Sequence, residues 1–270
     1  MTALLRPRPS GCPTGARPPT LVAVAHGSRD PAALRTVTAL VNAVRALRPD
    51  IPVRLGHIEL NRPLLADTLE ALRGEAVLVP LLLGRGHHVK VDLPEAAARA
   101  GHLTTRIAAP LGPHPLLAEA LHARLSEAAR QHRTPHHPKT IQAVVLAAAG
   151  SRDPDAAVDA AATAALLSAR LDGVPVVPAY ASAAAPTVAD AVRTLTSTRH
   201  SHPHHHPRNI AVASYFTAPG RFATQCADAA PGIAAAPLGA HPAVARLVLH
   251  RYEQALAGAP LSYRAVTVGV

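Results

Sequence analysis

TLVAVAHGSRDP, at residues 20–31, joins a continuous apolar run to the start of a helix. The run Thr20–Ala25 is typical of a strand that is buried on both faces, as in parallel sheets. Asp30 and Pro31 then supply an N-cap and a first-turn proline, and the apolar spacing extends the helix over Pro31–Leu47. The stretch therefore predicts a strand, a short polar turn and a helix, which together open an α/β unit.

The same alternation of apolar runs and amphipathic stretches continues along the chain. Further strands are predicted at Val53–Ile58, Ala76–Leu83 and Leu103–Ala108, and further helices at Arg62–Leu72, Leu93–Ala100 and Pro115–Arg130. Asn61 and Pro63 are the expected start of the second helix. Continuous apolar strands separated by helices favour a parallel sheet that is covered by helices on both faces.

Part of this pattern occurs twice. Three motifs return in the same order: Gly27–Pro31 as Gly150–Pro154, Pro63–Asp67 as Pro186–Asp190, and Ala109–Pro115 as Ala236–Pro242. Gly86 best matches Gly220, and these two lie further apart in the sequence than the two copies of the first motif do. The second half therefore carries an insertion, which falls on Arg199–Arg208 (RHSHPHHHPR). We therefore expect two tandem duplicated α/β domains, each a small parallel sheet flanked by helices.

Composition changes mark the expected boundaries of these domains. The predicted division is a disordered Pro-rich extension at 1–19, a first domain at 20–130, a linker at 131–139 and a second domain at 140–270. The linker is polar and rich in proline and histidine (QHRTPHHPK). The extension lacks the apolar core of a signal peptide, so we expect a cytoplasmic protein.

The formal charge of +10 admits a nucleic acid, a membrane surface or a polyanionic small substrate as partner, or simply a basic composition. Four Tyr and two Phe leave few platforms for stacking bases, and no dense Lys/Arg cluster is present, so no nucleic acid is expected. No apolar run is long enough to cross a membrane. With two cysteines, neither a disulfide framework nor a thiolate metal cluster is indicated.

Three ligand-type residues follow three successive predicted strands. His26 comes directly after the first, Glu59 follows the second, and His88 lies in the loop after the third. Ligands bind at the carboxyl ends of strands in open parallel sheets, so these side chains can converge if the first strand is central. Two imidazoles and a carboxylate suit Fe, Co, Ni or Zn, and imidazole can also act as a general base. The trio predicts a metal site, with a structural or capping role as the alternative.

The second half of the chain lacks all three of these groups. Ala149, Ser182 and Phe222 stand at the equivalent positions. Purely structural residues have no reason to be lost as a set while the scaffold is kept. The joint loss favours a shared site that is kept in one half and is dispensable in the other.

These motifs resemble the sirohydrochlorin chelatase family, the cobalt or iron chelatases of cobalamin and siroheme synthesis. The resemblance rests on AHGSRDP (Ala25–Pro31), IELNRP (Ile58–Pro63) and GHHVKVDLP (Gly86–Pro94). It implies the long form, with two chelatase-like domains in one chain. By this resemblance the metal-site histidines fall on His26 and His88, and the acidic residue on Glu59. His87 is the alternative to His88, because the two are neighbours in the motif.

The resemblance implies insertion of Co²⁺ or Fe²⁺ into a tetrapyrrole that lies between the two domains. His26 and His88 would hold or deliver the metal and accept pyrrole protons, and Glu59 would complete the site or relay protons. No cofactor beyond the substrate metal is expected, and the duplication favours a monomer with an internal pseudo-dimer. Candidates to bind the substrate carboxylates are Ser28, Arg29, Arg62, Arg85 and Lys90, with surface solvation as the alternative.

Other features of the sequence bear on functions besides metal insertion. Histidines in the insertion and the linker could bind Ni, Co or Zn, so a non-catalytic His-rich metal carrier stays open, as does a nickel-specific tetrapyrrole chelatase. The alternative interpretation of the histidine tract is a low-complexity insertion that is tolerated and has no metal-binding role. A histidine phosphatase needs an Arg before its His-Gly pair, where this chain has Ala25. A dinucleotide or P-loop site is not supported, because the glycine-rich motifs are absent after the first strand.

Overall fold

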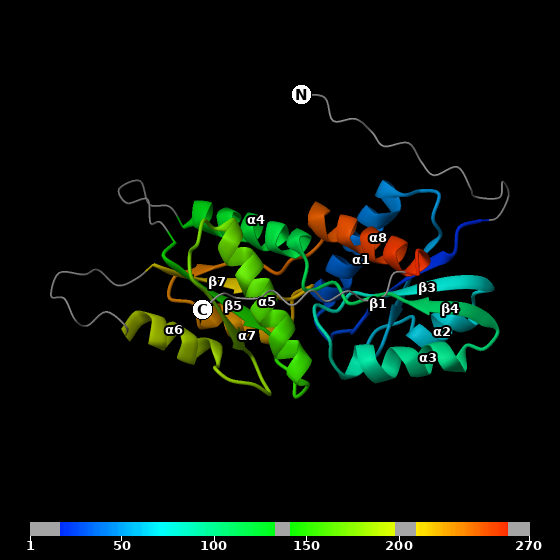
Figure 1. Ribbon diagram of the computed structural model, residues 1–270, viewed down its shortest axis with the longest axis horizontal. Helices are drawn as coiled ribbons and strands as arrows, with labels where there is room; N and C mark the ends of the chain where they lie inside the picture. The colour runs from blue at the N-terminus through cyan, green and yellow to red at the C-terminus, as the bar shows by residue number, and fades with distance from the viewer. Residues whose placement is uncertain (1–16, 133–140, 198–208, 259–270) are drawn as a thin grey trace, which may run out of the picture.

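The computed structural model describes residues 17–132, 141–197 and 209–258, which form two parallel sheets (Figure 1). The first sheet has the order β2-β1-β3-β4, with strands Thr20–Ala25 (β1), Val53–His57 (β2), Gly74–Pro80 (β3) and Leu103–Ile107 (β4). The second has the order β6-β5-β7-β8, with strands Ala143–Ala148 (β5), Val176–Tyr180 (β6), Ile210–Ser214 (β7) and Ile233–Ala234 (β8). The predicted duplicated α/β fold is confirmed, and β1 is an inner strand.

Helices cover both faces of each sheet. They are Pro31–Leu47 (α1), Leu65–Glu70 (α2), the π-helical turn His88–Asp92 (η1), Leu93–Arg99 (α3), Pro115–Gln131 (α4), Pro154–Arg170 (α5), Val188–Ser197 (α6), Arg221–Asp228 (α7) and Pro242–Leu256 (α8). The predicted extension and linker fall mostly outside the described residues, and the insertion 199–208 entirely so. The domain bounds therefore stay a prediction.

Two local expectations from the sequence were wrong. The helix predicted at Arg62–Leu72 begins only at Leu65, because Asn61 does not cap it: the Asn61 side chain accepts a hydrogen bond from the Ser28 backbone N–H at 2.7 Å instead. The helix predicted from Leu93 has an extra turn before it, η1, so His88 begins a helix rather than lying in a loop. π-helical turns occur often at functional sites.

Alternate residues of the central strands face two different cores. In β1, Leu21 and Ala23 point into a core that runs through both halves of the chain, while Val22 and Val24 point into a separate core under α2 and α3. This alternation is the period of two that a strand imposes on its side chains. A third core lies under α6 and α7 on the outer face of the second sheet.

The two halves exchange their last helices. Helix α4, from the first half of the chain, packs against α5, β7 and β8, while α8 from the second half packs against α1, β3 and β4. Figure 1 shows the exchange: α4 lies with β5 and β7, and α8 lies with α1 and β3. Leu117, Leu121 and Leu125 of α4 are at most 1% exposed, and each buried leucine contributes roughly 1.5–3 kcal/mol. One face of each sheet is therefore only partly covered by the helices of its own half.

Matched arginines secure the exchanged helices. Arg124 of α4 donates from Nη2 to the carbonyl oxygen of Leu238 at 3.0 Å, and Arg251 of α8 donates from Nη2 to that of Leu111 at 3.0 Å. Both carbonyls belong to the repeated APLG motif. The interface between the halves thus has the self-complementary form of a two-fold dimer, built within one chain.

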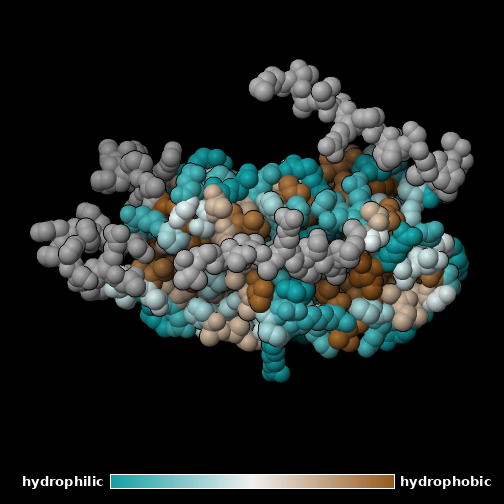
Figure 2. Space-filling model, viewed as in Figure 1, coloured by the Kyte–Doolittle hydropathy of each residue, from teal (hydrophilic) through white to brown (hydrophobic). Residues whose placement is uncertain are grey.

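The outer surface mixes polar and apolar residues. On the face shown in Figure 2, hydrophilic residues lie along much of the outline, and hydrophobic residues appear in smaller patches between them. Among the described helices, none combines the length and the hydropathy needed to cross a bilayer.

Candidate metal centre and cleft

His26 and Glu59 meet at the carboxyl end of the first sheet. The Glu59 backbone N–H donates to the His26 carbonyl at 3.0 Å, which extends the pairing of β1 and β2 by two residues. Gly27 follows with φ +107°, and a Cβ there would stand 1.9 Å from the Glu59 carbonyl oxygen. Only glycine fits that close approach, so the turn delivers both side chains to one place.

The environment of His26 sets its tautomer. Its Nδ1 lies 3.3 Å from the Gly27 carbonyl oxygen and 3.5 Å from Glu59 Oε1. Both neighbours are acceptors, so in the neutral ring Nδ1 carries the proton and Nε2 keeps its lone pair. The two side chains are 44% and 53% exposed, which leaves Nε2 accessible to a metal ion or a proton.

His88 is oriented in the same way by a different carboxylate. Its Nδ1 is hydrogen-bonded to Asp92, one helical turn later, and the nitrogen donates because a carboxylate only accepts. Asp92 also lies 3.7 Å from Nε2 of His87. The His88 ring stands edge-on to that of His26 with 4.6 Å between centroids, whereas His87 is 73% exposed. His88, not His87, is therefore the partner of His26.

With Asp92, the trio forms a pair of imidazoles that each have a carboxylate near Nδ1: Glu59 for His26 and Asp92 for His88. A carboxylate on the far nitrogen fixes the orientation of the ring, as for metal-bound histidines in general. Glu59 faces the Nδ1 side of His26, and among the described residues no three His, Cys, Asp or Glu side chains already form a metal-binding cluster. The ligand roles of His26, Glu59 and His88 stay a prediction.

The second half repeats the backbone of this site without its chemistry. The Ser182 N–H donates to the Ala149 carbonyl at 3.0 Å, as Glu59 does to His26. Gly150 has φ +87° and would clash with the Ser182 carbonyl if it carried a Cβ. Phe222 lies in the first turn of α7, as His88 lies in that of η1. Hydrogen bonding thus agrees with the equivalence of His26 to Ala149 and of Glu59 to Ser182, and that of His88 to Phe222 rests on their places at the start of a helix.

A cleft of about 990 Å³ runs between the two halves and includes His26 and His88 in its lining. This is near the upper end of the range of roughly 300–1,000 Å³ for ligand pockets. Its first-half wall carries Leu60, which is 53% exposed, and its second-half wall carries Phe222, which is 37% exposed. Two large apolar side chains thus face a space that also holds the histidine pair.

The structure separates the cationic candidates into two groups. Arg29 is exposed and lines the cleft, while Arg62 lies outside the lining with its side chain 77% exposed and paired to Asp67 at 2.6 Å. Arg85 also lines the cleft, but both Arg85 and Lys90 are engaged by carboxylates of α5 or of its N-cap. Lys90 Nζ lies 2.7 Å from Asp153, and this pairing raises the pKa of Lys90 and lowers that of Asp153.

The two halves of the chain each match the same known protein family. The family model described as CbiX matches the chain twice, over residues 20–128 and 143–255. The chain belongs to the CbiX family.

Curated relatives of this CbiX-family chain are shorter. The sirohydrochlorin cobaltochelatase of Methanosarcina barkeri is 29% identical over 123 residues, which cover 40% of this chain and 95% of the relative. That of Sulfurisphaera tokodaii is 33% identical over 82 residues, covering 29% and 68%.

Two solved structures share the fold of the whole CbiX-family chain. SirB from Bacillus subtilis with Fe³⁺ has a TM-score of 0.69 at 22% identity, covering 88% of this chain and 96% of that one. The CbiX described as the terminal enzyme for biosynthesis of siroheme in denitrifying bacteria has a TM-score of 0.65 at 23% identity, covering 87% and 99%. The duplicated architecture is therefore shared by both.

Several residues around the CbiX site were missed from the sequence. Asp92 could have been found, because it stands four residues after His88, the spacing that places two side chains on one helix face. Arg221, which lines the cleft with its guanidinium 5.8 Å from the Phe222 ring, gave no local signal. His57, buried at the end of β2, bonds through Nδ1 to the Pro63 carbonyl, and burial lowers its pKa.

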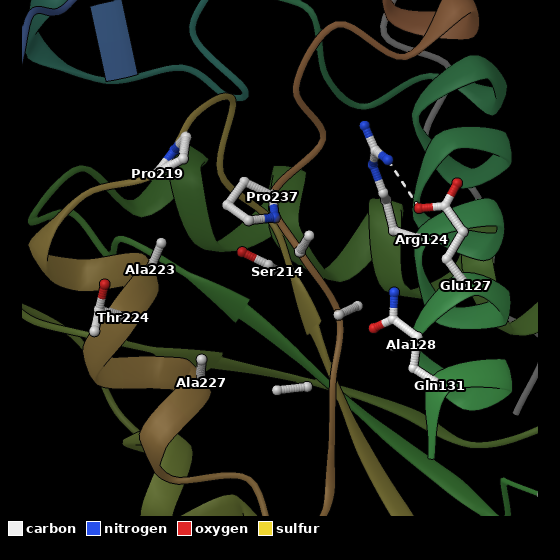
Figure 3. Close-up of a pocket in the computed structure, with 13 residues that line it drawn as sticks. Arg124, Glu127, Ala128, Gln131, Ser214, Pro219, Ala223, Thr224, Ala227 and Pro237 are labelled. Carbon is white, nitrogen blue, oxygen red and sulfur yellow. Dashed lines mark hydrogen bonds and ion pairs between the residues drawn. The ribbon is translucent and has the colours of Figure 1, made fainter. Parts of the chain in front are cut away.

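A second, smaller pocket of about 270 Å³ lies between α4 and α7 (Figure 3). Alanine and proline make up much of its wall, and on α4 Arg124 pairs with Glu127 at 2.8 Å. The Ser214 hydroxyl at the end of β7 is buried and has no hydrogen-bond partner among the described residues. Within the described part of the chain, no histidine or cysteine lines this pocket.

Proposed function

We propose that this chain is a sirohydrochlorin chelatase, which inserts Co²⁺ or Fe²⁺ into the tetrapyrrole in cobalamin or siroheme biosynthesis. The observation that carries the proposal is the pair His26 and His88, edge-on at 4.6 Å in a cleft of about 990 Å³. The names of the relatives, which are sirohydrochlorin cobaltochelatases, support it.

The reaction needs a metal held loosely and two pyrrole protons removed. The Nε2 atoms of His26 and His88 are the proposed ligands, because their Nδ1 atoms already face Glu59 and Asp92. Imidazole and carboxylate are acceptable to both metals, and two imidazoles leave coordination positions open for the ring nitrogens. Once the metal passes to the macrocycle, the freed imidazoles accept the pyrrole protons, and the exposed carboxylate of Glu59 passes one on to water.

The tetrapyrrole itself is flat, apolar on its faces and rimmed with carboxylates. Leu60 and Phe222 supply apolar contacts on opposite walls of the cleft. Arg29 from the first half and Arg221 from the second are exposed and line the cleft, where a guanidinium can pair with a carboxylate through two hydrogen bonds. Ser28, at the entrance to α1, adds a hydroxyl beside them.

The proposal also covers the oligomeric state of the protein, its location in the cell and its cofactor requirement. One chain supplies both walls of the cleft, so the active form is a monomer with an internal pseudo-dimer, acting in the cytoplasm. No cofactor is required beyond the substrate metal.

The test is a direct assay of insertion. Sirohydrochlorin is mixed with Co²⁺ or Fe²⁺ and the protein, and the visible spectrum is followed against the reaction without protein. His26→Ala and His88→Ala should each reduce the rate to the background, while His122→Ala, on α4 outside the cleft lining, should not. A wild-type rate equal to the background would reject the proposal. Loss of metal binding on deletion of residues 199–208 alone would favour the metal carrier.

A further inference from the structure

The segment that leads to His88 is held from the opposite half of the molecule. Between β3 and η1, the Leu81 carbonyl accepts a hydrogen bond from Thr217 Oγ1 at 2.9 Å, and the Leu83 carbonyl accepts one from the Tyr215 hydroxyl at 2.7 Å. Tyr215 is 5% exposed, and its hydroxyl also lies 3.1 Å from that of Thr163 on α5. The backbone of this segment is therefore attached to the second sheet.

Asp159 makes the strongest of these attachments. Its carboxylate accepts hydrogen bonds from the Arg85 backbone N–H at 2.8 Å, from Nε at 3.1 Å and from Nη2 at 2.7 Å. Asp159 is 1% exposed, and Arg85 lies three residues before His88. Movement of Arg85 away from Asp159 would leave a buried charge without its partner, which is strongly destabilising. Asp159 therefore keeps Arg85, and the backbone at that point, in one position.

A second contact lies on the other side of His88. Lys90 Nζ is 2.9 Å from Asp155 and 2.7 Å from Asp153, the N-cap of α5, and Asp155 also lies 3.3 Å from Arg85 Nη1. His87 and His88 are thus bracketed by two cations that are both bound to the first turns of one helix.

The duplication shows that these contacts belong to one half only. Where α5 has Asp155 and Asp159, α1 has Ala32 and Thr36, at the positions matched by the GSRDP repeat. Where the first half has Arg85, the second has Pro219. The half that lacks the metal-site groups therefore has carboxylates that its duplicate lacks, and they bind the cations beside His88.

We propose that Asp155 and Asp159 are positioning residues for metal insertion, which fix His88 opposite His26 by holding Arg85 and Lys90 from the second half of the chain. The inference rests on the proposed function, since it takes His88 as a metal ligand. The second half is then more than a wall of the cleft: its helix α5 sets the geometry of the site in the first half. Arg85 acts through this contact rather than by binding the tetrapyrrole carboxylates.

Cobalt affinity in the absence of tetrapyrrole tests this inference. Calorimetric titration of the full chain with Co²⁺ should show a Kd that rises about tenfold in Asp159→Asn, the size of effect typical of outer groups that orient metal ligands. Asp155→Asn should show a smaller rise, and Asp159→Glu, which keeps the charge, should restore much of the affinity. The KM for sirohydrochlorin should stay unchanged while kcat falls. Glu119→Gln is the matched control, because it removes a cross-half ion pair to Arg246, 2.7 Å long, that joins α4 to α8.

Each other outcome has a distinct meaning. If His88→Ala abolishes cobalt binding but Asp159→Asn binds like wild type, the inference is wrong and the proposed function stands. If Asp159→Asn raises only the KM for sirohydrochlorin, Arg85 serves the substrate and the inference is wrong. If the wild-type chain binds no Co²⁺, both are rejected. Should Asp159→Asn fail to fold, Asp155→Asn decides, because its carboxylate is 39% exposed and its loss leaves the core intact.

Discussion

Glu59 Oε1 lies 3.5 Å from His26 Nδ1, while the Glu59 backbone N–H donates to the His26 carbonyl at 3.0 Å. The backbone contact is repeated in the second half by Ser182 and Ala149, and the contact between the side chains is not, because neither group is present there. The carboxylate is thus placed on a scaffold that exists independently of it, so its contribution can be measured without disturbing the fold.

Glu59→Gln should therefore lower the rate of metal insertion and leave stability nearly unchanged. The amide keeps the shape of the side chain but loses the charge that orients His26 and takes up its proton, a loss we expect to cost about 10–100-fold in rate. Insertion is followed by the visible spectrum and stability by urea unfolding. Ser182→Ala changes the equivalent position of the second half and should leave the rate at the wild-type value. A Glu59→Gln rate equal to wild type would contradict the proton role.

A second metal site should appear when the missing groups are restored in the second half. The triple variant Ala149→His, Ser182→Glu and Phe222→His uses a backbone that already has the matching hydrogen bond and glycine turn. Co²⁺ stoichiometry by calorimetry should rise from one to two per chain. The new site should be the weaker, since Cys226 occupies the position of Asp92. An unchanged stoichiometry would show that the backbone alone does not prepare the site.

The exchanged helices should depend unequally on their two arginines. Arg251 is buried and Arg124 is partly exposed, and each donates to a carbonyl of the opposite half. Arg251→Met leaves the buried Leu111 carbonyl without this donor, which should reduce the free energy of unfolding by about 1–3 kcal/mol. Arg124→Met should cost less, because the Arg124 side chain is 24% exposed and water can enter the place that it leaves. Urea unfolding at pH 7 measures both, and an equal or reversed order would contradict this role.

Protonation of His114 should destabilise the protein in mild acid. Neutral His114 caps α4 through Nδ1, which accepts from the Leu116 N–H at 3.1 Å. Burial, with the charges of Arg251 and His250, lowers its pKa from 6.5 to about 4. Because the folded-state pKa is the lower one, this stability is present above pH 6.5 and is lost as the pH falls through about 4.

His114→Asn retains a capping side chain that does not titrate. Between pH 7 and pH 4.5, the wild type should lose about 2 kcal/mol more unfolding free energy than this variant. Urea unfolding at the two pH values measures the difference. Parallel losses in both proteins would show that His114 does not titrate as the structure implies.

The sequence alone determined the features that depend on local spacing. Apolar periodicity predicted β1 and α1, and the returning GSRDP motif predicted a second sheet like the first. The positions of His26, Glu59 and His88 at strand ends predicted their neighbourhood, because parallel strands bring their carboxyl ends to one edge. The errors at Asn61 and before Leu93 arose where a polar side chain bonded to a distant segment or a π-turn extended a helix.

Only the tertiary structure decided which half covers which sheet and what holds the site. The exchange of α4 and α8 leaves no local pattern, since an amphipathic helix shows which face is buried but not which sheet buries it. Arg85 and Asp159 are 74 residues apart in the chain, and neither belongs to a motif that names the other. Side-chain contacts across such a separation are set by packing of whole layers, so the attachment of His88 to the second half became visible only in the folded chain.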